Sequence, residues 1–323
     1  MTWASLKNRF RSGQGSGQSH FVLPRLVLEI EPSFVVGASL DTSARALRRI
    51  ALCEMNPQTI NPVPNADNIA NIEELRRAVA RVTELVGEGS HHVGLLVPDG
   101  SVRVVILTLE TLAEDSREAD TLVRWRMKET LPYPPDEAKI SYQVLWNEPG
   151  SVGLLVVAAK NSLLSEYEQA LGSKNGGFEL ILPSTMALLP LLSDTETQVR
   201  LLVHVCCGGL TSVVVQGSRV RSWRTHALGS TPAEEMVRDV SAEVTRVLAS
   251  TRDRLNIEVE KILLCARPPA GAKLARELGE TIAKEIQNLV PESRLGSALS
   301  TAEGGIFDSV GTPIAGLLTN LGS

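Results

Sequence analysis

The chain has 323 residues, a formal net charge of −5 and a hydrophobic fraction of 43%. This length predicts about two domains, or one α/β unit split into lobes, and the apolar fraction excludes wholesale disorder. The acidic balance argues against a general nucleic-acid binder, because phosphate contacts need a basic face, so no nucleic-acid partner is expected.

The sequence shows no membrane span and no secretion signal. No segment approaches a run of about 18 apolar residues, which a membrane helix needs, and the first twenty residues lack the apolar centre of a signal peptide. The four cysteines form no Cys-x-x-Cys pair and the five histidines no metal-ligand pattern. We therefore expect a soluble, cytosolic protein with reduced, buried thiols and no metal site.

Residues 1–20 are expected to form a flexible basic tail. They contain Lys7, Arg9 and Arg11 but no acidic residue, and they end in a linker rich in glycine, serine and glutamine. An alternative is an amphipathic anchor that contacts an anionic membrane or a partner.

The first half of the chain is expected to alternate between strands and helices, according to its apolar periodicity. Strands are expected at 23–30, 34–40, 48–54, 92–98, 102–109, 140–146 and 152–158, and helices at 72–86, 115–129, 162–171 and 184–192. The dipeptide Asp99-Gly100 is a common turn, so the strands on either side of it are expected to form a hairpin.

The second half is expected to begin with a three-stranded meander and to continue into helices. Its expected elements are strands at 200–205, 212–216, 219–227 and 259–265, and helices at 232–255, 272–289 and 314–321. Each half thus begins with antiparallel strands and proceeds into helices. This order predicts an internally duplicated α/β architecture, with an extra ββαβ piece in the first half.

Four segments of the first half resemble one known family in their order and spacing. They are a strand, Pro-Asp and strand at 92–103, a helix ending in a tyrosine between prolines at 122–134, a Tyr-Gln-Val-Leu strand at 140–145, and an apolar strand at 156–160. Residues 92–160 resemble PilM, the actin-like cytoplasmic component of type IV pilus assembly. The cytoplasmic part of GspL and the protein FtsA are relatives of that family.

The resemblance implies a bilobed, actin-like (ribonuclease H-like) fold. Lobe 1 would comprise 21–90 and 151–195, an inserted subdomain 91–150, and lobe 2 residues 196–323, with the last helix able to return to lobe 1. PilM-like proteins lie beneath the inner membrane, so the resemblance also implies a cytoplasmic protein held peripherally at that membrane through its partner.

The resemblance implies a scaffold that binds the cytoplasmic tail of a PilN-like bitopic protein and contacts other pilus assembly proteins; it leaves self-association open. The family's partner peptide lies between the first lobe and its insert. The matching residues here are Arg124, Trp125, Lys128 and Tyr133. Trp125 could equally lie in the core, and the cations on this helix, Arg126 included, could form a solvated face.

Actin-like enzymes hold ATP and magnesium between their lobes, and the residues that would do so are altered here. The first phosphate hairpin, Asp-Ile-Gly-Ser-Ser in the family, corresponds to Glu29-Ile30-Glu31-Pro32-Ser33. It thus gains a second carboxylate and loses an N–H donor. The second, Asp-Ile-Gly, corresponds to His204-Val205-Cys206, with Gly208 and Gly209 just beyond.

These changes predict a pseudo-ATPase that keeps the fold and has lost nucleotide hydrolysis. The Gly-Gly turn that approaches the adenosine is also missing after the strand at 259–265. The alternative is an active ATP-binding protein that uses Glu29, Ser33, Gly208 and Gly209. A sugar kinase of the same superfold is disfavoured, because its glycine pattern is absent.

Overall fold

A computed structural model describes most of the chain, namely residues 11–12, 24–41, 46–87, 93–172, 178, 180–192, 198–206, 208–228, 233–266 and 271–321. The basic tail expected at 1–20 lies outside the described residues except for Arg11–Ser12. His91, His92 and Cys207 also lie outside them. Cys206 and Cys265 are buried, whereas Cys53 is partly exposed.

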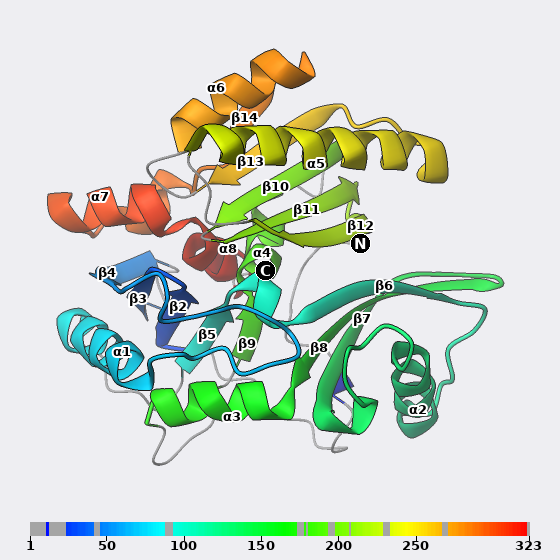
Figure 1. Ribbon diagram of the computed structural model, residues 1–323, viewed down its shortest axis with the longest axis horizontal. Coiled ribbons are helices and arrows are strands. Elements are labelled where there is room, and N and C mark those ends of the chain that lie inside the picture. The colour runs from blue at the N-terminus through cyan, green and yellow to red at the C-terminus, as the bar shows by residue number, and fades with distance from the viewer. Residues whose placement is uncertain are drawn as a thin grey trace.

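Three β-sheets organise the described residues (Figure 1). The first sheet has the order β4-β3-β2-β5-β9, with β2 (Leu26–Glu31), β3 (Phe34–Asp41), β4 (Ala46–Glu54), β5 (Val93–Val97) and β9 (Leu180–Pro183). The second has the order β12-β11-β10-β13-β14, with β10 (Val199–Cys206), β11 (Gly209–Gln216), β12 (Arg219–Ala227), β13 (Lys261–Ala266) and β14 (Ile286–Asn288). The insert sheet has the order β1-β7-β8-β6, with β1 (Arg11–Ser12), β6 (Arg103–Leu109), β7 (Ala138–Glu148) and β8 (Ser151–Lys160).

The first and second sheets have the same topology. In each, three consecutive strands form an antiparallel meander, and two later strands add in parallel beside the first strand of that meander. Parallel strands need a crossover connection, which the helices between them supply. The internal duplication expected from the order of elements is therefore confirmed.

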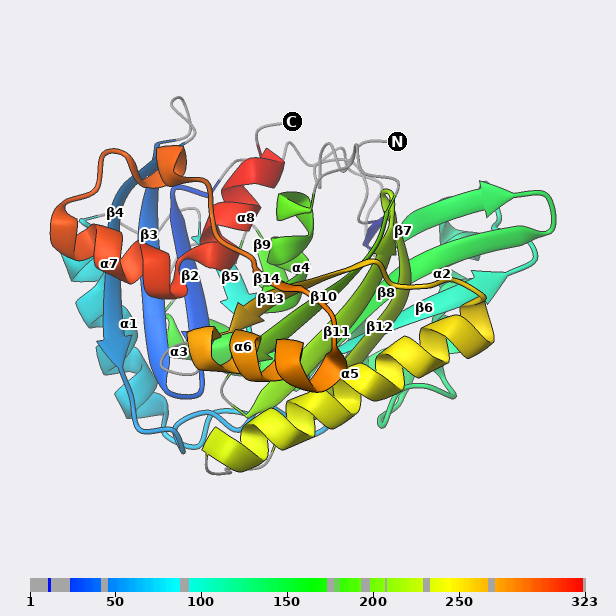
Figure 2. The ribbon, with the colours of Figure 1, turned by 90° about the horizontal axis from the view of Figure 1, so that it is seen from above.

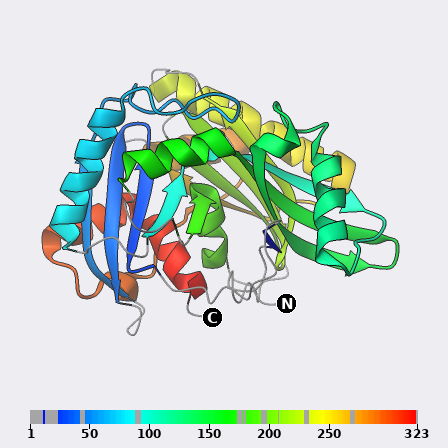
Figure 3. The same ribbon diagram turned by 90° about the horizontal axis from the view of Figure 1, so that it is seen from below.

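Helices cover the sheets on several sides. The α-helices are α1 (Ile72–Val86), α2 (Ser116–Met127), α3 (Asn161–Ala170), α4 (Ser184–Leu188), α5 (Ala233–Leu255), α6 (Gly271–Ile282), α7 (Thr301–Val310) and α8 (Thr312–Leu321). Short 3-10 turns are η2 (Asp99–Ser101), η3 (Pro135–Glu137), η4 (Leu189–Leu191) and η5 (Ser293–Gly296). Helices α5 and α6 cover the second sheet (Figure 2), while α1 and α3 cover the first and α2 covers the insert sheet (Figure 3).

The last two helices pack onto the first lobe. Their apolar residues Phe307, Ile314 and Leu317 belong to the same buried cluster as strands β2 and β3. Helix α8 lies against α4, and a Cβ at Gly316 would come within 2.1 Å of the Ala187 carbonyl oxygen. Glycine is therefore required for this approach of the two backbones.

The insert differs from the expected one in the order of its elements and in which strands belong to it. Strand β5 pairs with β2 in the first sheet, and β6 pairs with β8 in the insert sheet, so the hairpin expected around Asp99-Gly100 is wrong. Strand β8, expected in lobe 1 as part of 151–195, pairs with β6 and β7. The subdomain is therefore a βαββ unit rather than ββαβ, because strand pairing between distant segments outweighed the local turn signal.

Two expectations near the C-terminus also need correction. The helix expected over 272–289 ends at Ile282, and β14 follows because Ile286–Asn288 find backbone partners along β13. Helix α7 was not expected. Its start carries a capping box, in which Ser300 and Glu303 satisfy each other's backbone N–H groups.

Candidate functional site: the α2 groove and the interlobe cavity

An open groove of about 700 Å³ runs along α2 on the surface of the insert. We call it the α2 groove; its lining residues are Thr121, Arg124, Trp125, Lys128, Leu131, Pro132, Tyr133, Pro134, Pro135 and Asp136. All four residues predicted to bind a partner, Arg124, Trp125, Lys128 and Tyr133, are therefore brought together along one surface. Their role in binding remains a prediction.

The sequence of α2 explains why this surface faces outward. Asp115 caps the helix by accepting hydrogen bonds from the N–H groups of Arg117 and Glu118, at 2.9 and 3.0 Å. The apolar residues Ala119, Val123 and Met127 are fully buried and recur at the helical spacing that places them on one face. Packing of this face onto the insert sheet leaves the opposite side of the helix at the surface.

Trp125 is exposed, which decides between the two alternatives for this residue. Its side chain is 64% exposed, a large value for a tryptophan. The Arg126 guanidinium lies 5.9 Å from the centroid of its ring, within the range of a cation–π interaction. Lys128 is also exposed. The groove therefore presents an indole and the Lys128 ammonium to solvent, with the Arg126 guanidinium beside the indole.

Tyr133 and Arg124 shape the groove from within. Tyr133 is buried, its hydroxyl has no hydrogen-bond partner among the described residues, and burial raises the pKa of the phenol to about 12. The Arg124 Nη1 donates to the carbonyl oxygens of Pro135 and, at 3.3 Å, of Ala138. Arg124 therefore holds the loop that follows α2, which makes it a positioning residue for the groove.

A second, smaller hollow lies between the two lobes. This interlobe cavity has a volume of about 180 Å³. Residues 62–64 and Asp99, Gly100 and Arg103 line it from the first lobe and the start of the insert, and Gly208, Gly209 and His226 from the second lobe. Gly208 has a φ of 79°, which a side chain would strain. A cavity of this size is below the roughly 300–1,000 Å³ of ordinary small-molecule pockets.

A buried network joins the lobes beside this cavity. Thr185 donates its N–H to Asp99 Oδ1 at 3.0 Å and its hydroxyl to Asp99 Oδ2. The His204 Nδ1 lies 2.7 Å from Thr185 Oγ1 and 3.5 Å from Asp99 Oδ2. All three side chains are almost completely buried. Burial acts to raise the pKa of Asp99, but hydrogen bonds from His204 and Thr185 outweigh it and hold that pKa below its ordinary value.

Only two of the residues predicted to form a degenerate nucleotide site line the interlobe cavity. Glu29 and Glu31 are completely buried within the first lobe, where Ser184 Oγ donates to Glu31 Oε1 at 3.3 Å. Glu29 and Ser33 are not among the residues that line the interlobe cavity, whereas Gly208 and Gly209 are. The network of Asp99, Thr185 and His204 was missed, because sequence spacing gives no sign that these residues meet.

The described residues contain no group of three or more histidine, cysteine or acidic side chains that could hold a metal ion. They also contain no helix that is both long and apolar enough to span a membrane.

Solved structures share this architecture. The chain is similar to the PilM-PilN type IV pilus biogenesis complex, with a TM-score of 0.76 and 17% identity, covering 93% of this chain and 98% of that one. It is also similar to a Bacteroides thetaiotaomicron protein with an actin-like ATPase fold, with a TM-score of 0.54 and 10% identity, covering 94% and 99%. No protein-family model and no curated protein matches the sequence. The likeness confirms the expected actin-like fold.

Proposed function

We propose that this chain is a cytoplasmic scaffold of a type IV pilus or related secretion-type assembly complex. It binds the cytoplasmic tail of a PilN-like bitopic protein through the α2 groove, and it does not hydrolyse nucleotide. The observation that carries the proposal is the convergence of Trp125, Lys128 and Tyr133 on one open groove, in a chain similar to the PilM-PilN complex.

The chemistry of the groove suits an extended peptide. An exposed tryptophan supplies a large apolar contact of the kind that dominates protein interfaces. Lys128 in the lining, and Arg126 beside the indole, favour carbonyl groups and acidic side chains. The volume of about 700 Å³ admits several side chains of a peptide. Association with the inner membrane follows from the partner, whose membrane segment would hold this chain at the membrane surface.

The buried network supports the loss of nucleotide chemistry. A carboxylate between the lobes could hold magnesium in an enzyme of this fold, but Asp99 here is occupied by Thr185 and His204. Binding a metal there would require these hydrogen bonds to break in a buried site, which is costly. Glu29 and Glu31, which are completely buried, are also unsuited to binding phosphate groups, because their carboxylates repel phosphate.

The alternative function is an ATP-binding protein that regulates the same machinery. The observation in its favour is the positive φ of Gly208, which keeps an open backbone turn beside the interlobe cavity. Such turns cradle phosphate groups in other proteins.

Two titrations separate the two functions. Isothermal titration of ATP with magnesium into the full chain is compared with titration of the cytoplasmic tail peptide of a PilN-like protein encoded near its gene. Saturable peptide binding without ATP binding is expected. Micromolar ATP binding would contradict the loss of the nucleotide site, and absence of peptide binding would contradict the partner assignment.

A further inference from the structure

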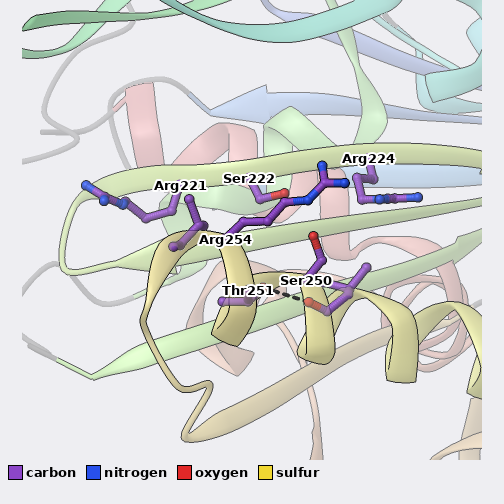
Figure 4. A pocket seen from close by; sticks show the side chains of 8 residues that line it. Arg221, Ser222, Arg224, Ser250, Thr251 and Arg254 are labelled. Atoms are coloured by element: carbon purple, nitrogen blue, oxygen red, sulfur yellow. Dashed lines mark hydrogen bonds between the residues drawn. The ribbon is translucent and has the colours of Figure 1, made fainter.

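The arginine pocket is a small cavity of about 230 Å³ between strand β12 and helix α5, away from the α2 groove and the interlobe cavity. Val247 and Leu255 contribute to its wall, and its polar lining consists of Arg221, Ser222, Arg224, Ser250, Thr251 and Arg254 (Figure 4). No acidic residue is among the lining residues. This pocket plays no part in the proposed function.

A β-bulge in β12 creates the polar wall of the arginine pocket. Ser222 pairs with Val214 and Val220 with Val215, which leaves Arg221 as the extra residue. Since Val214 packs in the cluster beneath α5, its cross-strand partner Ser222 faces α5 as well. Without the bulge, alternation would place Ser222 on the same face as Val220, towards the other lobe.

The side chains leave several hydrogen-bond donors directed into the pocket. In Figure 4, Arg254 extends from α5 towards Ser222 and Arg224, and the Ser250 hydroxyl points into the same space. Arg254 makes no salt bridge within the described part of the chain. Arg221 points away, and its guanidinium lies 5.7 Å from the centroid of the Trp146 ring.

Arg224 is held in place by a buried carboxylate. Its Nε donates to Glu243 Oε1 at 3.1 Å, and Glu243, which is 3% exposed, is shared with Arg246. One carboxylate therefore offsets two guanidinium groups, so the neighbourhood of the pocket keeps a net positive charge once Arg254 is included. Fixed guanidinium groups recognise oxyanions with little loss of side-chain entropy.

From this arrangement we infer that the arginine pocket binds a single phosphate group, either inorganic phosphate or the phosphate of a small phosphomonoester. Guanidinium forks and hydroxyls together match the several acceptor oxygens of a phosphate, which approach from more directions than those of a carboxylate. The volume of about 230 Å³ is below that of pockets for whole drug-sized ligands. The pocket therefore fits the anionic group, with the remainder of a monoester outside.

The test is isothermal titration of inorganic phosphate and of glycerol phosphate into the full chain at constant ionic strength, with acetate as the carboxylate probe. Saturable binding of phosphate and weaker binding of acetate are expected. Equal binding of both phosphate probes identifies the phosphate group itself as the ligand, and preference for the monoester identifies contacts outside the pocket. No saturable phosphate binding, or equally tight acetate binding, would overturn the proposal.

Matched variants locate the site. Arg254→Gln should weaken phosphate binding by roughly tenfold or more, because it removes a charge-assisted hydrogen-bond donor. Arg252→Gln is the control, since Arg252 lies in the same last turn of α5, is 72% exposed and contacts Asp253 at 3.3 Å. Arg103→Gln tests the interlobe cavity in the same way. Equal losses in Arg254→Gln and Arg252→Gln, or a loss confined to Arg103→Gln, would contradict this site.

A second variant keeps the test independent of helix stability. Ser250→Ala removes one hydroxyl and should weaken phosphate binding by roughly threefold. Cations in the last turn also stabilise a helix end, and that role alone would lower the melting temperature of Arg254→Gln and Arg252→Gln alike without affecting Ser250→Ala. Unchanged phosphate affinity in both Arg254→Gln and Ser250→Ala would refute the proposal.

Discussion

The α2 groove and the buried network beside the interlobe cavity both contain polar and charged side chains, but they differ in how far those side chains are already engaged. In the interlobe network, Asp99, Thr185 and His204 bind one another and are buried. In the groove, Trp125 is 64% exposed and Lys128 makes no ion pair within the described residues. Groups that are engaged inside a protein must lose those bonds before they can bind a ligand, whereas exposed groups lose only water. The difference therefore favours the groove as the site that meets a partner.

The largest effect on stability is expected from a substitution that breaks the interlobe network. Asp99→Ala leaves the Thr185 N–H and hydroxyl without their acceptor, and two buried donors left unpaired cost about 3 kcal/mol of unfolding free energy. Urea unfolding measures this loss, and tail-peptide affinity should stay unchanged. Asp308→Ala, on the exposed side of α7, is the control and should change stability by less than about 0.5 kcal/mol. An equally small loss of unfolding free energy in Asp99→Ala would show that the network does not stabilise the fold.

Acid unfolding tests the contribution of the Asp99 carboxylate to stability in a second way. The pKa of Asp99 is lower in the folded protein than its ordinary value of 3.8. Its contribution to stability is therefore present above the unfolded pKa and is lost as the pH falls through the folded pKa. Below about pH 4, the parent protein should lose stability more steeply than Asp99→Asn. Parallel curves for the two proteins would contradict the lowered pKa.

Trp125→Ala tests the groove and should have the second largest effect. Truncating an exposed tryptophan at the centre of an interface costs about 2 kcal/mol of binding, so tail-peptide affinity should fall roughly thirtyfold. Stability should change little, since the side chain is exposed. Val290→Ala removes another exposed apolar side chain, 69% exposed and in a different part of the fold, and should leave the affinity unchanged. Equal effects of the two variants would exclude a specific groove.

Arg124→Gln should have an intermediate effect that acts through the loop. The Arg124 guanidinium donates to the carbonyl oxygens of Pro135 and Ala138, and hydrogen bonds that involve a charged group contribute about 1.5–3 kcal/mol. Glutamine keeps an NH2 donor, so the variant should destabilise the insert by only about 1 to 2 kcal/mol and weaken binding of the tail peptide as a consequence. Hydrogen exchange of the loop measures the local opening. Arg126→Gln is the control: it should weaken binding of the tail peptide without opening the loop.

The smallest expected effect concerns Tyr133. Its buried hydroxyl has no partner among the described residues, so Tyr133→Phe removes an unsatisfied polar group and should leave stability unchanged or slightly raised. The matched control is Tyr142→Phe, because the Tyr142 hydroxyl donates to Asp120 at 3.0 Å. That variant should lose about 1 kcal/mol. Thermal unfolding measures the stability of the two variants. A larger loss of stability in Tyr133→Phe than in Tyr142→Phe would show that the Tyr133 hydroxyl does form a stabilising hydrogen bond.

Local sequence signals predicted most helices and strands, but they could not predict which distant strands pair with one another. The helix expected at 72–86 is α1, because Asn71 caps its start and Gly87 ends it. The Asp99-Gly100 dipeptide suggested a hairpin, but the strands beside it pair with partners in different sheets. Helix α7 could have been found from its capping box at Ser300 and Glu303.

The candidate site divides in the same way. The groove residues come from one contiguous stretch, so a resemblance in that stretch was enough to bring Arg124, Trp125, Lys128 and Tyr133 together. The interlobe network joins residues 86 and 19 positions apart in sequence, and no local pattern marks such a meeting. The altered acid at His204 was visible in the sequence, but its bond to Thr185 was not.

The packing of α7 and α8 onto the first lobe also constrains the order in which the chain can fold. Phe307, Val310 and Ile314 complete a core whose first strands begin at Leu26. During synthesis, the core of the first lobe is complete only after these residues leave the ribosome, whereas the last strand of the second sheet, β14, ends earlier, at Asn288. Contacts of such long sequence separation slow folding. The lobe that appears first in the sequence should therefore be the last to become protected from proteolysis in a growing chain.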